Sequence, residues 1–361
     1  MKRFLTNLLA ISLMLGSITF TSCSSNDDDG PIGKKPHEVA KIDKKSDTAL
    51  LLCSFGSTYE QPQKTYEAII ADYKKAYPNT DIYLSFTSKT IVNRVYAKIG
   101  KEFVQPKIWL KAISDAGYDK VYVQSLHIIP GEEYIGLMKQ TVYKDFMGEN
   151  PDVLVARGDC LLKSEEDIDA VANVLYKYYK PRLDKGEVVV FMGHGNPDKE
   201  FEVANKQYTL LEQKMQELSG AQNMIVGTVD WGDKMFGHVR ESLLAYAKEV
   251  GKESKDITVT LTPLMSIAGD HAQNDMLGGL EDGQKAEDVN AYEDDEDPEF
   301  TWILKIKKLG FNINPDGTTT DKDKFNVKGL ADHPEIRSIW VEHMKEAVKE
   351  ATTWNDLFEN E

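Results

Sequence analysis

The stretch Val188-Val189-Val190-Phe191-Met192-Gly193-His194-Gly195 joins an uninterrupted apolar run to two glycines that flank one histidine. Three β-branched residues followed by a phenylalanine are typical of a strand that is buried on both faces, as in a parallel sheet. The glycines indicate that this strand ends at His194, and ligands of open α/β sheets bind beyond the carboxyl ends of the strands. The sequence therefore predicts a nitrogen donor at the mouth of a cleft, with small neighbours that admit a large flat ligand.

A second histidine follows another expected strand, in Pro263-Leu264-Met265-Ser266-Ile267-Ala268-Gly269-Asp270-His271. Neutral imidazole is a good ligand for divalent first-row metals. His194 and His271 recur at equivalent places in two successive units, which favours a metal-handling site over two unrelated loop histidines. His127 also ends an apolar run, but a structural role explains it equally well.

Strands and helices alternate along most of the chain, which indicates parallel βαβ units. The pattern starts again after Ser164, so we expect two similar α/β halves, 47–164 and 165–333, with a cleft between them. The expected strands are 48–55, 82–86, 120–127, 153–157, 187–192, 223–230 and 257–264. The expected helices are 63–76, 107–116, 134–146, 165–179, 201–218, 238–249 and 334–353.

The composition excludes several classes of function. The chain has 361 residues, 41% of them hydrophobic, which is enough for one large domain or two ordinary ones. A formal net charge of −16 argues against nucleic-acid binding. No Gly-x-Gly-x-x-Gly follows the first expected strand and no Walker loop is present, so we expect neither NAD nor ATP as a cofactor. A nucleophile elbow and a His-Glu-x-x-His motif are also missing, which argues against acyl transfer and zinc proteolysis.

The N-terminus has the pattern of a lipoprotein leader. Two basic residues precede an apolar stretch, and small residues lead to Cys23. We expect a signal peptide over 1–22, lipid on Cys23 as a membrane anchor, and an acidic, flexible tether over 23–46. The protein would then be exported and anchored in the periplasm or at the outer membrane; the alternative is an uncleaved amphipathic anchor.

Two other local features of the chain are an acidic segment and a pair of cysteines. Residues 281–299 are strongly acidic and are expected to form a flexible insertion. Cys53 and Cys160 lie in or beside apolar strands and are expected to be small buried hydrophobes. Whether the chain forms a homo-oligomer is left open.

Several ordered motifs resemble the anaerobic-type sirohydrochlorin cobaltochelatases, over roughly residues 47–351. They are Ser54-Phe55-Gly56-Ser57, Phe86-Thr87-Ser88, Gln124-Ser125-Leu126-His127-Ile128-Ile129-Pro130-Gly131-Glu132-Glu133-Tyr134, Phe191-Met192-Gly193-His194-Gly195, Pro263 through Met276, and Gly329-Leu330 with His333-Pro334-Glu335-Ile336-Arg337. The resemblance implies a class II chelatase fold: α/β, with two Rossmann-like domains whose parallel sheets face a central cleft. It also implies that the last segment, 334–361, returns as a helix to the first domain.

The implied activity is ATP-independent insertion of Co²⁺ into sirohydrochlorin, a tetrapyrrole, with Ni²⁺ or Fe²⁺ as other candidate metals. The resemblance makes His194 a metal ligand and the base toward the pyrrole N–H, His271 a second ligand, and Glu133 a catalytic residue. The family usually has Val-Glu where this chain has Val229-Asp230, so Asp230 is expected as a third ligand with a shorter reach. The residues expected to bind the macrocycle are Phe55, Ser57, His127, Tyr134 and Trp231.

Two alternatives remain. Cobalamin synthesis is cytoplasmic, whereas Cys23 predicts an exported protein, so the chain could instead bind or deliver a tetrapyrrole such as haem, or a metal, at the envelope. A generic solute-binding protein also fits a lipoprotein with two halves, but it leaves the loops of His194 and His271 without a purpose.

Overall fold

The computed structural model describes residues 40–278, 301–313 and 328–358. The expected signal peptide, Cys23, the tether up to residue 39 and the acidic insertion 281–299 lie outside the described residues, so these interpretations stay predictions. Among the helices that are described, none has both the length and the apolar character needed to span a membrane.

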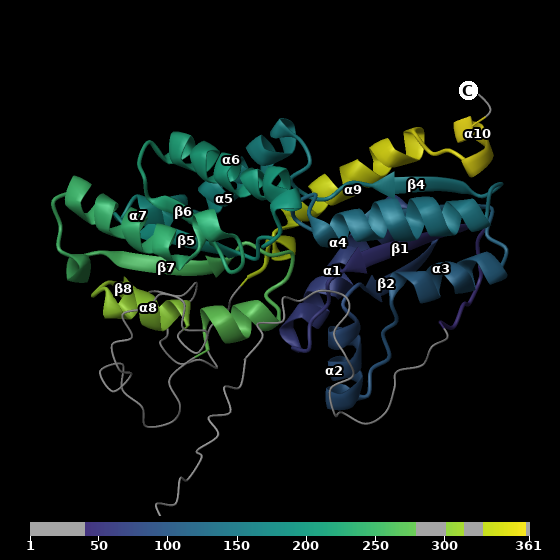
Figure 1. Ribbon diagram of the computed structural model, residues 1–361, viewed down its shortest axis with the longest axis horizontal. Helices are drawn as coiled ribbons and strands as arrows, with labels where there is room; N and C mark the ends of the chain where they lie inside the picture. Colours follow the sequence, from purple (N-terminus) through teal and green to yellow (C-terminus); the bar gives the residue numbers. More distant parts are fainter. Residues whose placement is uncertain (1–39, 279–300, 314–327, 359–361) are drawn as a thin grey trace, which may run out of the picture.

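Two parallel four-stranded sheets form the centre of the molecule (Figure 1). The first sheet has the order β2-β1-β3-β4 and consists of β1 (Thr48–Ser54), β2 (Asp81–Phe86), β3 (Lys120–Ser125) and β4 (Leu154–Gly158). The second has the order β6-β5-β7-β8 and consists of β5 (Val188–Gly193), β6 (Met224–Thr228), β7 (Thr258–Pro263) and β8 (Asn312–Ile313). The second sheet repeats the strand order of the first. The predicted α/β fold with two parallel sheets is therefore confirmed.

Helices cover both sheets. They are α1 (Gln61–Ala76), α2 (Lys89–Ile99), α3 (Pro106–Asp115), α4 (Glu132–Ile135), α5 (Glu165–Leu183), α6 (Glu202–Ser219), α7 (Phe236–Glu249), α8 (Trp302–Lys308), α9 (Pro334–Lys349) and α10 (Trp354–Phe358). A π-helix, Gly136–Met147, continues α4. The sequence interpretation missed α2, α8, α10 and the short strand β8. The ends of α2 carried readable signals, since the Ser88 hydroxyl caps its first turn and Gly100 ends it with a φ of 67°.

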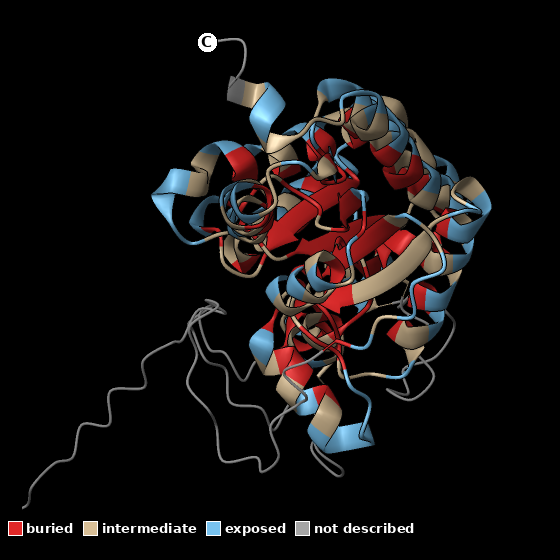
Figure 2. Cartoon of the chain, turned by 90° about the vertical axis from the view of Figure 1, so that its right-hand side faces the viewer, coloured by how far each residue is buried: buried red, intermediate tan, exposed pale blue. Residues whose placement is uncertain are grey.

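The strands are buried on both faces, as the apolar runs predicted. In β5, Val189 and Phe191 join one hydrophobic cluster, and Val188, Val190 and Met192 join another on the opposite face. Figure 2 shows the buried strands between helices whose outer faces are exposed. Cys53 and Cys160 are free and buried, which confirms their interpretation as small hydrophobes.

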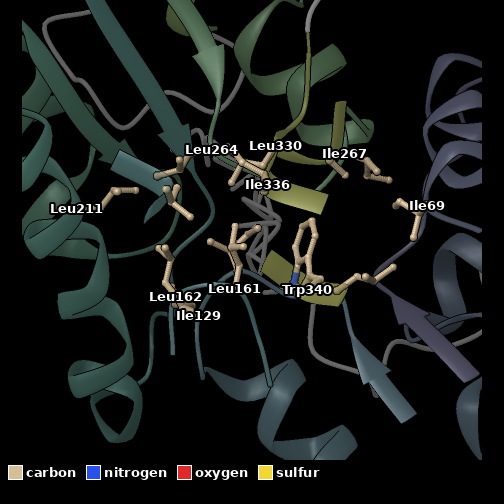
Figure 3. Close-up of a cluster of buried hydrophobic side chains, with 14 of the residues drawn as sticks. Ile69, Ile129, Leu161, Leu162, Leu211, Leu264, Ile267, Leu330, Ile336 and Trp340 are labelled. Carbon is tan, nitrogen blue, oxygen red and sulfur yellow. The ribbon is translucent and has the colours of Figure 1, made fainter. Parts of the chain in front are cut away.

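One hydrophobic cluster joins the two halves. It contains Leu50 and Leu52 from β1 together with Val189 and Phe191 from β5. Figure 3 shows part of the same cluster around Trp340 of α9, which is 1% exposed. Because burial of apolar surface is the main driving force of folding, this shared core holds the two sheets together.

The long helix near the C-terminus, α9, packs on the first sheet beside β4 and α1 (Figure 1). Arg337 Nε donates a hydrogen bond of 2.6 Å to Asp72 Oδ2 in α1. The predicted end of this helix at residue 353 is wrong: it ends at Lys349, because Thr352 leaves the helix and pairs with Val155. At the other end of the described chain, Ala40 is buried and Lys44 bonds Gly117 O, so residues 40–46 lie against the first half. The predicted domain limits themselves stay predictions.

The junction of α9 with α5 predicts an acid-sensitive contribution to stability. His343 Nε2 donates to Asp167 Oδ1 over 2.8 Å, and Asp167 forms a capping box with Ser164 at the start of α5. Burial alone would raise the pKa of Asp167, but the hydrogen bonds from His343 and Ser164 outweigh it and hold this pKa below its usual value. The stabilisation is therefore present above the pKa of an unfolded Asp, about 3.9, and is lost as the pH falls through the lower folded pKa.

We expect Asp167→Asn to flatten the pH dependence of stability in this acidic window. Urea unfolding midpoints measured from pH 7 down to pH 3 check the expectation. Asp169→Asn, which replaces an exposed carboxylate on the same helix, is the control and should keep the wild-type slope. A wild-type slope in Asp167→Asn would contradict the assignment.

Candidate active site

A cavity of about 160 Å³ lies between the two halves, at the carboxyl ends of the strands. Its walls come from loops that follow β1, β3, β5 and β7, within 55–56, 127–134, 194–197 and 264–271. β1 and β3 are the central neighbours of the first sheet, and β5 and β7 are their equivalents in the second. In doubly wound sheets with this strand order, the loops that follow the two central strands run to opposite faces of the sheet. They leave a crevice between them in which a ligand can bind.

His194 projects from the end of β5 into this region. Gly195, with a φ of 84°, packs so closely against Trp231 that a Cβ would clash with its backbone. The ring Nδ1 lies 2.8 Å from Gly195 O, and because a carbonyl can only accept, Nδ1 carries the proton. In the neutral ring the lone pair is therefore on Nε2, which lies 3.6 Å from Asp230 Oδ2.

His271, which follows the neighbouring strand β7, contacts His194 in the wall of the cavity. The two ring centroids are 4.6 Å apart in an edge-to-face arrangement. Backbone hydrogen bonds from Val229 to Gly193 and from Asp230 to His194 extend the β5–β6 pairing and bring Asp230 to the same place. The structure thus unites the three predicted metal ligands. In the described part of the chain, however, no group of three or more His, Cys, Asp or Glu side chains is close enough to hold a metal ion, so the ligand roles stay predictions.

Glu133 lines the same cavity from the first turn of α4. Burial raises the pKa of its carboxyl, and the charge of Glu132 adds to the increase, while Thr87 and His194 oppose it. A carboxyl whose pKa is displaced toward neutrality can exchange a proton with a reacting group. The geometry is compatible with the predicted catalytic role of Glu133.

Three of the predicted substrate-binding residues line the cavity: Phe55, His127 and Tyr134. Burial lowers the pKa of His127 to about 4, so its ring is neutral at physiological pH. Its Nδ1 lies 2.8 Å from the hydroxyl of Ser125. The Tyr134 hydroxyl donates to Asp159, which holds the ring at the edge of the cavity.

The other two predicted substrate residues are absent from the described cavity wall. Trp231 is 6% exposed, and its indole Nε1 donates to Glu202 Oε2 over 3.1 Å. Ser57 is fully buried and donates to Asp270 Oδ2 over 3.0 Å. Both residues support loops of the cavity, and their direct contact with a substrate stays a prediction.

Hydrogen bonds join the two halves at the rim of the cavity. Asp270, beside His271, accepts from Thr58 N at 2.9 Å and from Thr58 Oγ1 at 2.7 Å, in addition to Ser57. On another side, Asn196 Oδ1 accepts from Glu132 N at 3.1 Å. Sequence reasoning missed these contacts because Thr58 and Asp270 are 212 positions apart.

Helix α6 supports the loop that carries His194. The side chain of Asn205 is fully buried, accepts from Asn196 N at 2.9 Å and donates to Asn196 O at 2.8 Å. The Tyr208 hydroxyl interacts with the backbone of Gly195 and His194. Asn205 and Tyr208 were not singled out from the sequence, because an Asn and a Tyr on an amphipathic helix carry no motif.

A second network lies next to the turn that follows Asp230 and contains Glu212, Lys234 and His238. Glu212 Oε2 pairs with Lys234 Nζ, and Oε1 accepts from His238 Nε2 at 3.2 Å and from Val226 N at 2.8 Å. Lys234 N donates to Trp231 O at 3.0 Å. The network therefore connects α6 and α7 to the turn that follows Asp230.

The charge of the cavity wall is one-sided. Four carboxylates line it, from Glu132, Glu133, Asp230 and Asp270, whereas no Lys or Arg is among the described lining residues. A cleft lined by one sign of charge concentrates ions of the opposite sign. The wall therefore attracts a cation, and an organic ligand would face it with an uncharged part of its surface.

A family model and two sequence relatives indicate the same family. The model of the family described as "Cobalt chelatase (CbiK)" matches residues 48–349. A sirohydrochlorin cobaltochelatase of Salmonella typhimurium is 28% identical over 304 residues, which cover 84% of this chain and 97% of that protein. The sirohydrochlorin cobaltochelatase CbiKC of Nitratidesulfovibrio vulgaris is 26% identical over 318 residues, 87% and 94% of the two chains. The solved structure of SirB from Bacillus subtilis with Fe³⁺ has a TM-score of 0.48 at 15% identity and covers 83% of this chain and 95% of SirB.

Proposed function

The chain belongs to the cobalt chelatase (CbiK) family, and from this premise we propose that it inserts Co²⁺ into sirohydrochlorin without ATP. The observation that carries the proposal is the pair of imidazoles, His194 and His271, whose centroids are 4.6 Å apart beyond the carboxyl ends of two neighbouring strands, β5 and β7. Neutral imidazoles hold Co²⁺ well, and Ni²⁺ and Fe²⁺ are alternative substrate metals for the same nitrogen and carboxylate donors.

The reaction exchanges two pyrrole protons for one divalent cation. His194 and His271 bind Co²⁺ through ring nitrogens, and Asp230 neutralises part of its charge. As the cobalt–nitrogen bonds to the macrocycle form, the two N–H bonds break. Nε2 of His194, relieved of the metal, accepts one proton, and the Glu133 carboxylate accepts the other before both pass to water.

The acidic wall supports delivery of the cation. Its negative charge raises the local concentration of Co²⁺. The proposed ligands include no thiolates, which would hold the metal in a closed site and oppose its release to the macrocycle. The carboxylates of the substrate then extend away from the wall, since they would be repelled by Glu132, Glu133, Asp230 and Asp270. Phe55 and Tyr134 are suited to cover the macrocycle faces.

The macrocycle requires a wider cleft. The cavity of about 160 Å³ is smaller than the roughly 300–1,000 Å³ of most small-molecule sites. We propose that the cleft widens at its rim, where Asp270 accepts hydrogen bonds from Ser57 and Thr58 in the substrate-free protein. We propose the same reaction for the exported, lipid-anchored form that the Cys23 motif predicts.

Anaerobic incubation of the full-length protein in detergent with sirohydrochlorin and Co²⁺ tests the proposal. We expect the absorption spectrum to change to that of the cobalt complex faster than without protein, and added ATP to have no effect. The same assay with Ni²⁺ and Fe²⁺ ranks the metals.

The leader sequence with Cys23 favours a second candidate, an envelope protein that binds or delivers a tetrapyrrole such as haem. Stoichiometric haem binding without any acceleration of metal insertion would support this candidate and contradict the chelatase proposal.

A further inference from the structure

Asp275 lies against the Nδ1 side of the His271 ring. Its Oδ2 is 2.5 Å from His271 Nδ1, within the first turn of the π-helix Ala272–Met276. We propose that Asp275 is a positioning residue, which fixes the tautomer and the ring orientation of His271 so that Nε2 is the nitrogen offered to the metal. This inference rests on the proposed function of the site and adds a residue to it.

The tautomer follows from the chemistry of the contact. An ionised carboxylate has acceptor sites only, so the hydrogen of a 2.5 Å contact belongs to Nδ1. In a neutral imidazole the remaining lone pair is then on Nε2. Histidine ligands of metals generally donate their other N–H to a carboxylate, a carbonyl or water, which sets the ring orientation.

The two imidazoles of the site are held by acceptors of different strength. His194 Nδ1 donates to the neutral carbonyl of Gly195 at 2.8 Å, whereas His271 Nδ1 donates to a carboxylate. Hydrogen bonds with an ionised partner are roughly twice as strong as neutral ones. The structure thus separates a firmly oriented ligand, His271, from a less restrained ring, His194, which must bind metal and then accept a proton.

The residues around His271 hold the same segment from the other half of the molecule. Asp270 accepts hydrogen bonds from Ser57 and Thr58, and Asn274 Oδ1 accepts one of 2.8 Å from the Tyr59 hydroxyl. The segment thus has anchors that do not involve Asp275. The Asp275 side chain is 41% exposed, so its removal is expected to leave the fold intact and to act on His271.

The tautomer can be read directly in the metal-free, full-length protein. Long-range ¹⁵N–¹H correlation spectra distinguish imidazoles protonated on Nδ1 from those protonated on Nε2. We expect His271 to be the Nδ1–H form in the wild type and to shift toward the Nε2–H form, which free side chains prefer, in Asp275→Ala. His194 should keep its signals. A wild-type His271 protonated on Nε2, or an unchanged pattern in Asp275→Ala, would overturn the inference.

Steady-state kinetics supply the second readout. We expect Asp275→Ala to raise KM for Co²⁺ by about 10–100-fold, the usual effect of removing the partner of a histidine ligand. The KM for sirohydrochlorin should not change, and Asp275→Glu should restore part of the loss. Asp115→Ala, which removes an exposed carboxylate from another i,i+4 pair, is the matched control and should behave as the wild type.

The two assays separate the inference from the proposed function. If the wild type fails to accelerate Co²⁺ insertion, the function is wrong, whatever the tautomer. If the wild type is active but Asp275→Ala keeps either the Nδ1–H signal or the wild-type KM for Co²⁺, only the role of Asp275 is wrong.

Discussion

Replacing His194 by alanine is expected to slow Co²⁺ insertion by about 10²–10⁴-fold, the range for loss of a general acid or base. The ring lies 4.6 Å from His271, and its Nε2 lies 3.6 Å from Asp230. The substitution removes a metal-binding nitrogen and, with it, the acceptor proposed for one pyrrole proton. Initial rates of the spectral change at saturating sirohydrochlorin, over a range of Co²⁺ concentrations, check the expectation.

The fold should survive this change, because the His194 side chain is partly exposed and the loop is held by Asn205 and Tyr208. Retained binding of metal-free sirohydrochlorin and an unchanged thermal midpoint are the checks for folding. His343→Gln removes an imidazole between α9 and α5, outside the cavity, and is expected to keep the wild-type rate. A His194→Ala enzyme with nearly the wild-type rate would exclude His194 from the chemistry.

Replacing Glu212 by alanine is expected to lower the free energy of unfolding by about 3–5 kcal/mol, as for other buried ion pairs that lose one partner. The side chains of Glu212 and Lys234 are 8% and 5% exposed. Burial alone would raise the pKa of Glu212, but its contacts with His238 and Lys234 outweigh this and hold the pKa below its usual value, so the carboxylate is charged at neutral pH. The substitution leaves the Lys234 ammonium buried without that charge.

Urea denaturation at neutral pH measures the loss. Glu217→Ala on the same helix removes a carboxylate that is 72% exposed and should change stability by less than about 0.5 kcal/mol. The double variant Glu212→Leu/Lys234→Met should recover much of the stability, because apolar residues of similar volume often replace a buried pair without loss. A loss below about 1 kcal/mol in Glu212→Ala would show that water reaches Lys234 and that the network is not structurally important.

Much of the fold was predictable because its signals are local. The β-branched run Val188–Val190 is typical of a strand buried on both faces, and the apolar run Ala49–Cys53 in β1 indicates the same. The helix α5 begins where Ser164 and Asp167 form a capping box, a signal that four residues contain. Elements without such signals were missed: β8 has two residues and exists only because it pairs with β7.

Part of the candidate site was predictable for a geometric reason. Because the carboxyl ends of parallel strands meet at one edge, residues that follow different strands converge. His127, Glu133, His194, Asp230 and His271 all line one cavity. Ser57 and Trp231 also follow strands, but their side chains bond to other residues instead of lining the cavity. Their partners, Asp270 and Glu202, could not be identified from a local sequence pattern.

The sequence by itself determined the alternating strands and helices, the two strand-end histidines and the family resemblance, since each depends on neighbouring residues or on an ordered set of motifs. Only the tertiary structure decided that Ser57 and Trp231 turn away from the cavity, because their partners, Asp270 and Glu202, lie far from them in the sequence. It also decided how Asp270 and Thr58, 212 positions apart, close the rim of the cavity. Hydrogen-bond partners and burial are set by the packing of distant segments, and the chain must be folded before they exist.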